Sequence, residues 1–411
     1  MKLTVIAPHF APDVAPTGEV LSSIVHHLVE DGHRLHVVTA LPWYRHHRIE
    51  HGWHGRLVRN EETDWGRISR VHPFPTDKTN IPARALAFGG FTVLATLVAL
   101  LRRERPDAVL AMSPPLTLGL AGWLVARVRR VPFVFNIQDV FPDVAIEAGV
   151  IRGRRTIALF KALERFSYRR SDAVTVLSDD LADNLRGKLR PAERDRIRVI
   201  PNFIDTGRIA PGDRHNDYRA EFGLGERRVV MYAGNLGYSQ PVGLVLEAAR
   251  RLAGREDVVF VINGAGSARP ALEAEAADLP NVVFVDLQPR ERLGEVLAAA
   301  DVHLVLLRTG FARSSVPSKL YSILAAARPL VASVDPGTEV ARVVEEAGAG
   351  VAVPPDDPDA LVEALLPLID DPEHGDALGE AGRRFVESWP SPADIARRYE
   401  ALFDELRGSR C

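Results

Sequence analysis

The chain has 411 residues, of which 46% are hydrophobic and 26% are charged, and its formal net charge is −3 at pH 7. This length predicts two domains, and the composition excludes an intrinsically disordered protein. A net charge so close to zero also argues against a nucleic-acid-binding protein, in spite of the many arginines.

Short apolar runs predict the strands of the first half of the chain. Met1 leads directly into such a run, without the basic segment and following apolar segment that are typical of a signal peptide, so we expect no signal peptide. Continuous Val, Ile and Leu runs are typical of parallel strands that are buried on both faces. They occur at 3–8, 34–40, 108–113, 132–138, 173–178 and 197–202. Helix-length segments separate them, which predicts a doubly wound α/β domain.

An uncharged apolar segment at 85–101 is at the lower length limit for a membrane span. A pair of glycines interrupts it and a predicted strand follows at 108, so we expect a buried or surface-lying helix.

Residues 1–200 carry 29 Lys and Arg against 21 Asp and Glu, whereas residues 201–411 carry 22 against 33. The basic first half predicts peripheral contact with an anionic membrane.

The second half repeats the alternation of apolar runs and helix-length segments. Its predicted strands are at 228–235, 258–266, 281–287, 302–307, 329–334 and 350–355. A polar stretch at 203–225 breaks the pattern between the halves. We therefore expect a first domain at 1–203 and a second domain at 204–389.

The only cysteine, Cys411, excludes an intramolecular disulfide and a cysteine metal cluster and fits a cytoplasmic location.

The loops that follow the second-half strands carry residues suited to an anionic ligand. Ligands of doubly wound folds bind outside the carboxyl ends of the strands. The candidates are Gly234, Asn235 and Gly237 after the first strand, Gly264 and Gly266 after the second, Leu287 after the third, and Ser318 and Lys319 at a helix start after the fourth. Each loop alone could be an ordinary strand–helix turn, but together they predict a bound nucleoside diphosphate.

Candidates in the first half are fewer. Asp139 follows the predicted strand at 132–138 and is either a functional carboxylate or a helix cap. Gly18 opens a helix after a long loop in which His9 is either a site residue or an ordinary loop residue. The histidines between residues 45 and 55, which are His46, His47, His51 and His54, match no zinc spacing. His303 lies within an apolar strand and is expected to be a core histidine.

These motifs together resemble the family-4 retaining glycosyltransferases of the GT-B fold, over nearly the whole chain. The resemblance rests on "YAGNLG", "VINGAG", "AADVHLVLL", "PSKLYSILAAARPLVAS" and "VPPDDPDALVEALLPLIDD". "NIQDVFPDVAIEAG" is similar to a branch with N-acetyl-L-fucosamine and colanic-acid-type transferases of surface-polysaccharide assembly. The resemblance implies two Rossmann-like domains facing a cleft, with the last helix, within 390–411, crossing back to the first domain.

The chain departs from the family pattern at two glutamates spaced E-x7-E, the second of which binds the nucleotide ribose. Ser314 and Ser322 stand at these positions, and a serine cannot accept hydrogen bonds as a carboxylate does. A cation common in the family after the Gly-Asn-x-Gly loop is also missing, where Ser239 and Gln240 stand. Lys319 is then the clearest cation for the donor phosphates, with Ser318 and Ser322 beside it.

The resemblance implies an enzyme that transfers a sugar from a nucleoside diphosphate sugar, expected to be a UDP sugar, to an acceptor hydroxyl. We expect retention at the anomeric carbon, no metal and no cofactor, with Asp139 orienting or deprotonating the acceptor. Two alternatives stay open. One is a sugar-nucleotide 2-epimerase of the same fold, which needs more acid–base groups than Asp139. The other is a non-catalytic scaffold that has kept the nucleotide site.

Overall fold

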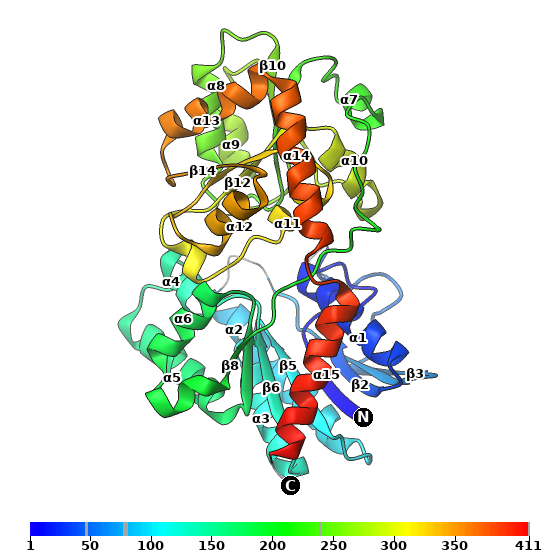
Figure 1. Ribbon diagram of the computed structural model, residues 1–411. Coiled ribbons are helices and arrows are strands. Elements are labelled where there is room, and N and C mark those ends of the chain that lie inside the picture. Colours follow the sequence, from blue (N-terminus) through cyan, green and yellow to red (C-terminus); the bar gives the residue numbers. More distant parts are fainter. Residues whose placement is uncertain (46–47, 77–80, 238–239, 410–411) are drawn as a thin grey trace. The chain divides into compact units, whose positions relative to one another are not determined.

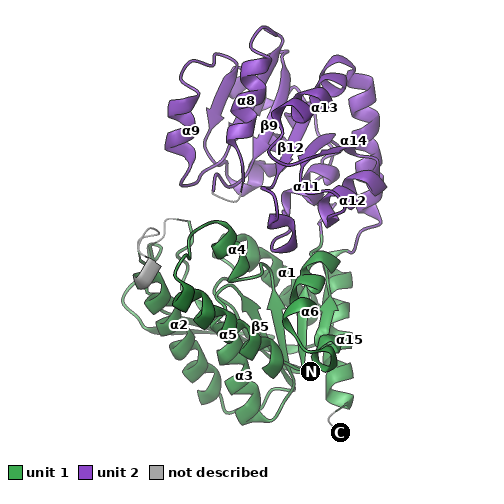
Figure 2. Ribbon diagram, turned by 90° about the vertical axis from the view of Figure 1, so that its left-hand side faces the viewer, with its two compact units in different colours: residues 1–203, 391–411 green, residues 204–390 purple. Residues whose placement is uncertain are grey.

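The computed structural model describes residues 1–45, 48–76, 81–237 and 240–409. His46, His47 and Ser239 therefore lie outside the described residues. The chain divides into two compact units (Figures 1 and 2). Unit 1 comprises residues 1–203 and 391–411, and unit 2 comprises residues 204–390.

Unit 1 is built on an eight-stranded sheet. In chain order its strands are β1 (Lys2–Ile6), β2 (Arg34–Ala40), β3 (Val58–Thr63), β4 (Gly66–Val71), β5 (Ala108–Ser113), β6 (Phe133–Ile137), β7 (Ala173–Val176) and β8 (Ile197–Val199). Their order across the sheet is β3-β4-β2-β1-β5-β6-β7-β8, and only the β3–β4 pair is antiparallel within the described residues. The chain thus winds outward in both directions from the β1–β5 pair.

Helices cover both faces of this sheet. They are α1 (Pro16–Glu30), α2 (Ile81–Leu101), α3 (Leu118–Arg129), α4 (Asp143–Glu147), α5 (Arg154–Arg170), α6 (Asp179–Lys188) and α15 (Pro392–Gly408). The aliphatic face that includes Val37 and Val134 packs against α1 and α15. The opposite face includes Phe133, whose ring lies where a Cβ on Gly122 of α3 would be. Helix α3 in turn contacts α2 and α5, so these three helices cover the second face.

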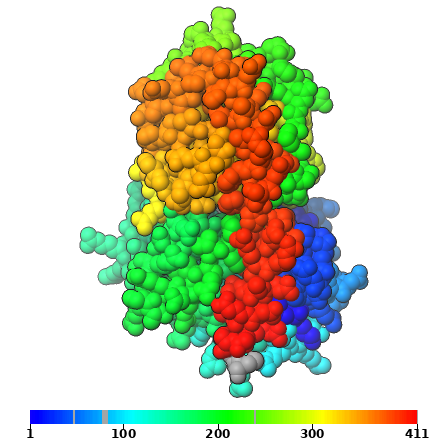
Figure 3. Space-filling view, in the orientation of Figure 1, coloured from blue at the N-terminus to red at the C-terminus, as the bar shows by residue number. Residues whose placement is uncertain are grey.

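The C-terminal helix α15 belongs to unit 1 although unit 2 precedes it in the sequence. Ser391 caps the helix by accepting a hydrogen bond from the Asp394 N–H. The buried hydroxyl of Tyr399 accepts a hydrogen bond of 2.8 Å from the Asn136 side chain in the sheet. Figure 3 shows this red segment lying against the blue segment that includes α1. The predicted return of the last helix to the first domain is confirmed.

Unit 2 contains a six-stranded parallel sheet in the order β11-β10-β9-β12-β13-β14. Its strands are β9 (Arg228–Ala233), β10 (Val258–Asn263), β11 (Val282–Val285), β12 (Val302–Leu306), β13 (Leu330–Ser333) and β14 (Gly350–Val353). Its helices are α7 (Asp217–Glu221), α8 (Gly243–Arg251), α9 (Arg269–Glu275), α10 (Leu293–Ala298), α11 (Lys319–Ala325), α12 (Glu339–Ala347), α13 (Pro358–Asp370) and α14 (Pro372–Glu387). This is the strand order of a Rossmann fold.

Each of the apolar runs predicted as a strand contains one, and the predicted pair of Rossmann-like domains is confirmed. The β3–β4 hairpin was missed. Its outer strand has the sequence "VRNEET", and its residues alternate between partly buried and exposed positions. An antiparallel edge strand with one solvent-exposed face has no continuous apolar run, so such runs do not predict it.

Candidate active site

The candidate site of unit 2 lies where the winding of its sheet changes direction. β9 and β12 are neighbours, and Val302 and His303 pair with Val230 and Met231. From β9 the chain proceeds to β10 and β11 on one side, and from β12 to β13 and β14 on the other. The loops that follow β9 and β12 therefore diverge at the carboxyl ends of these strands, which is where doubly wound folds bind their ligands.

Lys319 reaches this position from the first residue of α11. Its Nζ lies 3.7 Å from the ring centroid of Tyr232 in β9, and a Cβ on Gly234 would lie 2.9 Å from the same nitrogen. Within the part of the chain that the structure describes, this buried ammonium has no hydrogen-bond partner. Burial lowers the pKa of Lys319 to about 7, because the charged form loses its hydration without gaining a hydrogen bond.

The glycines predicted to approach a ligand also pack against one another. Gly234 has a φ of +144°, a conformation that other residues rarely adopt. A Cβ on Gly264 would overlap the carbonyl oxygen of Gly234, and a Cβ on Gly266 would overlap that of Leu236. Gly264 and Gly266 thus allow the loop after β10 to lie directly on the loop after β9. This packing positions Gly234 beside Lys319.

The remaining predicted residues of unit 2 occupy different positions around these loops. Asn235 accepts a hydrogen bond of 2.7 Å at its backbone oxygen from the Tyr232 hydroxyl, and a Cβ on Gly237 would lie 2.7 Å from the Asn235 side-chain nitrogen. Ser318 precedes α11 and is exposed, while Ser322 lies one turn after Lys319. Leu287 is also exposed. The donor contacts of these side chains stay predictions.

The predicted residues of unit 1 lie at the carboxyl ends of its own strands. Asp139 follows β6 and is half-buried. The preceding residue, Gln138, donates a hydrogen bond of 2.8 Å to Asn136 and accepts one of 3.0 Å from Asn202. These bonds hold the loop that carries Asp139. Gly18 lies in the first turn of α1, where a Cβ would lie 2.8 Å from the Cβ of His9, so close packing explains this glycine.

His9, which the sequence allows to be either a site residue or an ordinary loop residue, lies in an ordered cluster. Its Nδ1 lies 2.6 Å from a carboxylate oxygen of the buried Asp13. The other oxygen of Asp13 accepts a hydrogen bond of 3.1 Å from the Tyr44 N–H. The imidazole stacks on Trp43 with ring centroids 5.7 Å apart. A carboxylate at Nδ1 favours a proton on that nitrogen of the ring. The i, i+4 spacing of His9 and Asp13 was the available signal.

His303 is the core histidine that its apolar strand predicts. Its Nε2 donates a hydrogen bond of 2.9 Å to the carbonyl oxygen of Leu297. Burial lowers its pKa to about 4, so the ring is neutral at pH 7. Among the described residues, no group of three or more His, Cys, Asp or Glu side chains could hold a metal ion.

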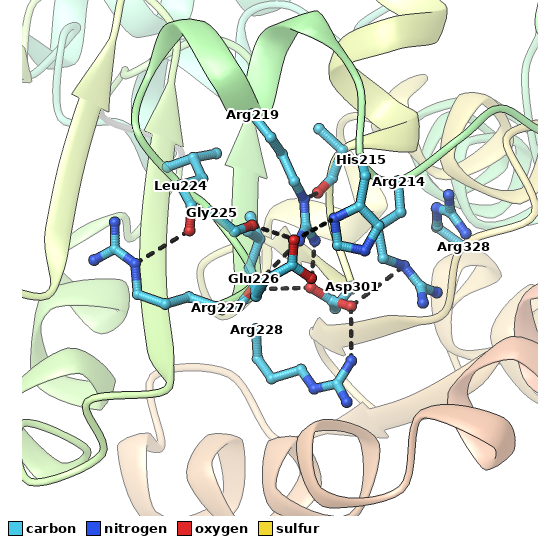
Figure 4. Close-up of polar contacts among 12 residues, drawn as sticks. Arg214, His215, Arg219, Leu224, Gly225, Glu226, Arg227, Arg228, Asp301 and Arg328 are labelled. Carbon is cyan, nitrogen blue, oxygen red and sulfur yellow. Dashed lines mark hydrogen bonds and ion pairs between the residues drawn. The ribbon is translucent and has the colours of Figure 1, made fainter.

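A second charged cluster of unit 2 lies at the opposite edge of the sheet, because Asp301 immediately precedes β12. The buried Asp301 carboxylate lies 2.5 Å from Arg219, 3.2 Å from Arg214 and 3.4 Å from Arg228 (Figure 4). Arg328 donates to the carbonyl oxygens of Ala298 and Gly212, and burial lowers its pKa to about 10. These contacts tie the segment before β9 to the sheet and are distant in the fold from Lys319.

Two family models match the chain, one within each unit. Residues 17–202 match a glycosyl transferase 4-like domain, and residues 227–371 match the glycosyl transferases group 1. A putative colanic acid biosynthesis glycosyl transferase, WcaI of Escherichia coli strain K12, is 27% identical over 401 residues, which cover 94% of this chain and 97% of the relative. The probable glycosyltransferase WbjE of Pseudomonas aeruginosa is 30% identical over 306 residues, 71% of this chain and 74% of the relative.

Solved structures of low sequence identity share the fold. Sucrose-phosphate synthase from Thermosynechococcus elongatus superposes with a TM-score of 0.78 at 17% identity, covering 100% of both chains. HepE of Anabaena, solved in complex with UDP and glucose, superposes with a TM-score of 0.72 at 14% identity, covering 99% of this chain and 100% of that one. The motifs, the fold and the relatives agree: the chain is an enzyme that belongs to the family-4 glycosyltransferases of the GT-B fold, of the colanic-acid type.

Proposed function

We propose that this glycosyltransferase moves a sugar from a nucleoside diphosphate sugar to an acceptor hydroxyl in the assembly of a cell-surface polysaccharide or glycoconjugate. The observation that carries the donor class is the buried ammonium of Lys319 at the change of direction of the unit 2 sheet, which has no hydrogen-bond partner among the described residues. A donor diphosphate supplies the hydrogen-bond acceptors and negative charge that this ammonium lacks. The colanic-acid name of the WcaI relative supports the polysaccharide assignment.

We propose a UDP sugar as the donor, in particular a UDP-N-acetylhexosamine or a deoxy amino sugar. The Anabaena neighbour with the same fold was solved with UDP and with UDP-glucose, which supports the uridine nucleotide. The glycine-packed loops after β9 and β10 place Gly234 beside Lys319. The two serines at the family's glutamate positions, Ser314 and Ser322, leave the ribose contact to other groups.

Departure of the nucleoside diphosphate in this proposal is assisted by Lys319 and not by a divalent cation. Negative charge develops on the leaving diphosphate as the bond to the sugar breaks, and a cation fixed nearby stabilises that charge most in the transition state. The resemblance to retaining enzymes supports transfer with retention at the anomeric carbon. If chelator-treated enzyme still releases the nucleoside diphosphate from the donor, this step does not require a metal ion.

In this proposal the acceptor binds to unit 1. Asp139 orients or deprotonates the acceptor hydroxyl, and the hydrogen-bonded Gln138 beside it keeps its loop in place. His9 is a second candidate group for an acceptor hydroxyl, because Asp13 holds its Nδ1 and its Nε2 has no hydrogen bond among the described residues. Contact of unit 1 with an anionic membrane at the cytoplasmic face is part of the same proposal.

The two other functions considered from the sequence are not favoured. The relatives that match most of the chain carry glycosyltransferase names, and none of those reported above is an epimerase. Incubation with a UDP-N-acetylsugar in the absence of an acceptor separates the two activities, since an epimerase converts the sugar and a transferase needs the acceptor.

Calorimetry with UDP and with uridine tests the donor proposal. We expect UDP to bind much more tightly than uridine, because only UDP offers phosphates to Lys319. A thermal-shift screen of nucleoside diphosphate sugars then identifies the donor, since a ligand that binds only the native state raises its unfolding temperature. Equal affinity for UDP and uridine would exclude the assigned phosphate site.

A further inference from the structure

We propose that the surface formed by α2, α3 and α5 docks unit 1 on an anionic lipid bilayer, with α2 lying along the membrane plane. This inference deepens the partner part of the proposed function by naming the surface and its occupant. It rests on three observations that are independent of the donor site. These are an exposed apolar stripe, a concentration of exposed arginines, and the packing of the hidden side of α2.

The apolar stripe lies on the solvent side of α2 and α3. The exposed fractions of Leu86, Val93, Leu97 and Leu101 on α2 are 78%, 60%, 51% and 80%. Their spacing places them along one side of the helix, and Leu124 and Val128 are exposed on the neighbouring α3. Single exposed leucines are common on proteins, but a contiguous set on two packed helices indicates an interaction surface.

The three helices of the surface are rich in basic residues and carry few carboxylates. The segments 81–105, 118–130 and 152–170, which contain the three helices, carry 14 Lys and Arg against two carboxylates, Glu104 and Glu164. The rest of residues 1–200 carries 15 against 19. Helices α1 and α15, on the other face of the sheet, carry three arginines against six carboxylates. The whole basic excess of the first half is therefore confined to the proposed surface.

Many of these cations are available to an external anion. Glu164 is buried and bound to Lys188, so it neutralises none of the exposed charge. Among the described residues, no carboxylate forms an ion pair with six exposed arginines of the surface: Arg103, Arg127, Arg130, Arg154, Arg155 and Arg165. Anionic headgroups match this charge, and the acyl chains of the lipids match the apolar stripe of α2 and α3.

The hidden side of α2 favours a helix that lies on the bilayer over one that crosses it. Residues 83–101 are long and apolar enough to cross a membrane, with a mean hydropathy of 1.9. However, Phe91, Ala95 and Ala99 are buried, and the Thr92 hydroxyl lies 2.7 Å from that of Thr117, at the start of α3. A crossing helix would have to leave this contact and expose the sheet beneath it. Burial of one side only is typical of an interfacial helix.

Hydrogen bonds join the end of α2 to that of α3, and a ring contact joins α3 to α5. Arg105, after α2, donates hydrogen bonds of 3.0 and 3.1 Å to the carbonyl oxygens of Arg129 and Arg130 at the end of α3. Trp123 of α3 packs edge-on against Phe166 of α5 at 5.1 Å. Trp123 is half-buried at this junction, and tryptophan favours the headgroup region of bilayers.

Co-sedimentation with phosphatidylglycerol/phosphatidylcholine vesicles tests the proposal, with pure phosphatidylcholine vesicles as the neutral reference. We expect binding to the anionic vesicles that weakens as salt is raised. The variant Arg127→Gln/Arg155→Gln/Arg165→Gln should weaken this binding at least about tenfold, because each basic residue contributes near an anionic surface. The variant Leu86→Ser/Val93→Ser/Leu97→Ser should weaken it by a similar factor through loss of the apolar contact.

Two matched controls separate this surface from general effects of charge and hydrophobicity. Arg384→Gln/Arg397→Gln/Arg398→Gln removes the same charge from exposed positions on α14 and α15, and Leu57→Ser removes an exposed leucine elsewhere in unit 1. Both should bind vesicles as the wild type does. All variants should bind UDP as the wild type does, which shows that they are folded and keeps this test independent of the donor proposal.

Three results would overturn the inference. They are absence of wild-type binding at low salt, equal binding by wild type and the surface arginine variant, and binding that resists both high salt and alkaline extraction. The last result would identify a crossing helix. Failure of the donor assay with vesicle binding intact would refute the donor site and leave the membrane surface standing.

Discussion

Replacement of Lys319 by methionine should stabilise the free protein and at the same time weaken its binding of UDP. Methionine has nearly the length of lysine and no charge, so it can occupy the space beside Tyr232 and Gly234 without a burial penalty. The wild-type ammonium is enclosed there without a hydrogen-bond partner among the described residues. A residue that is unfavourable for the free fold and favourable for the complex is the expected signature of a ligand-binding group.

The size of the stability effect follows from the pKa of Lys319, which burial lowers from 10.5 to about 7. Between these two values the unfolded chain binds more protons than the folded one, so the wild-type protein becomes more stable as the pH rises through this window. The linkage corresponds to a penalty on the order of 4 kcal/mol at pH 7 and about 2 kcal/mol at pH 9. Lys319→Met should therefore be more stable than wild type, by an amount that shrinks toward pH 9.

The binding effect has the opposite sign. A charge-assisted hydrogen bond contributes roughly 1.5–3 kcal/mol, so loss of the ammonium should weaken UDP binding about 10- to 150-fold. Wild-type affinity for UDP should also fall as the pH rises from 7 to 9, since the free lysine loses its proton over this range and must regain it to bind phosphate. Uridine should bind both proteins equally. Lys319→Arg should restore UDP binding only in part. The lysine nitrogen already packs closely against Gly234, since a Cβ built on this glycine would lie 2.9 Å from it, and a guanidinium is larger than an ammonium.

Urea denaturation at pH 7 and pH 9 measures the first effect, and calorimetry with UDP and uridine measures the second. Equal UDP affinity of wild type and Lys319→Met would refute the phosphate assignment. An unchanged or lowered stability of the variant at pH 7, with its UDP affinity lost, would instead refute the reasoning that the lysine is an unfavourably buried cation in the free protein.

Three further substitutions or treatments test other parts of the structure. Asp139→Asn should lower turnover about 100-fold or more and leave UDP affinity nearly unchanged, since it keeps the shape and removes the base; near-normal turnover in steady-state assays would make Asp139 a loop residue only. Turnover should survive EDTA, and loss of activity that Mg²⁺ or Mn²⁺ restores would contradict the assignment of charge stabilisation to Lys319. Asp301→Asn should cost about 3 kcal/mol of unfolding free energy, because it removes the buried carboxylate that pairs with the buried Arg219. The control Asp376→Asn, at a half-exposed carboxylate, should cost less than about 1 kcal/mol in the same denaturation experiment.

The architecture was predictable because its signals are local. A parallel strand that is buried on both faces needs a continuous apolar run, and such runs mark all strands of both sheets except β3 and β4. The polar stretch after residue 203 marked the passage to unit 2, which begins at Ile204. The β3–β4 hairpin was missed because the edge strand β3, with the sequence "VRNEET", contains a single apolar residue and therefore no apolar run. The sequence of α2 is apolar on all sides of the helix, so it does not predict which side is buried in the protein.

The candidate site was predictable in its residue types and not in its arrangement. Glycines after β9 and β10 and a lysine after β12 are visible in the sequence, as is the i, i+4 pair of His9 and Asp13. That Lys319 lies beside Tyr232 and Gly234, some 85 residues earlier, follows only from the pairing of β12 with β9. The enclosure that lowers the lysine pKa is likewise a property of the packed loops. Local sequence sets which groups each strand end carries, whereas the order of strands in the sheet decides which of those groups meet and how much water remains around them.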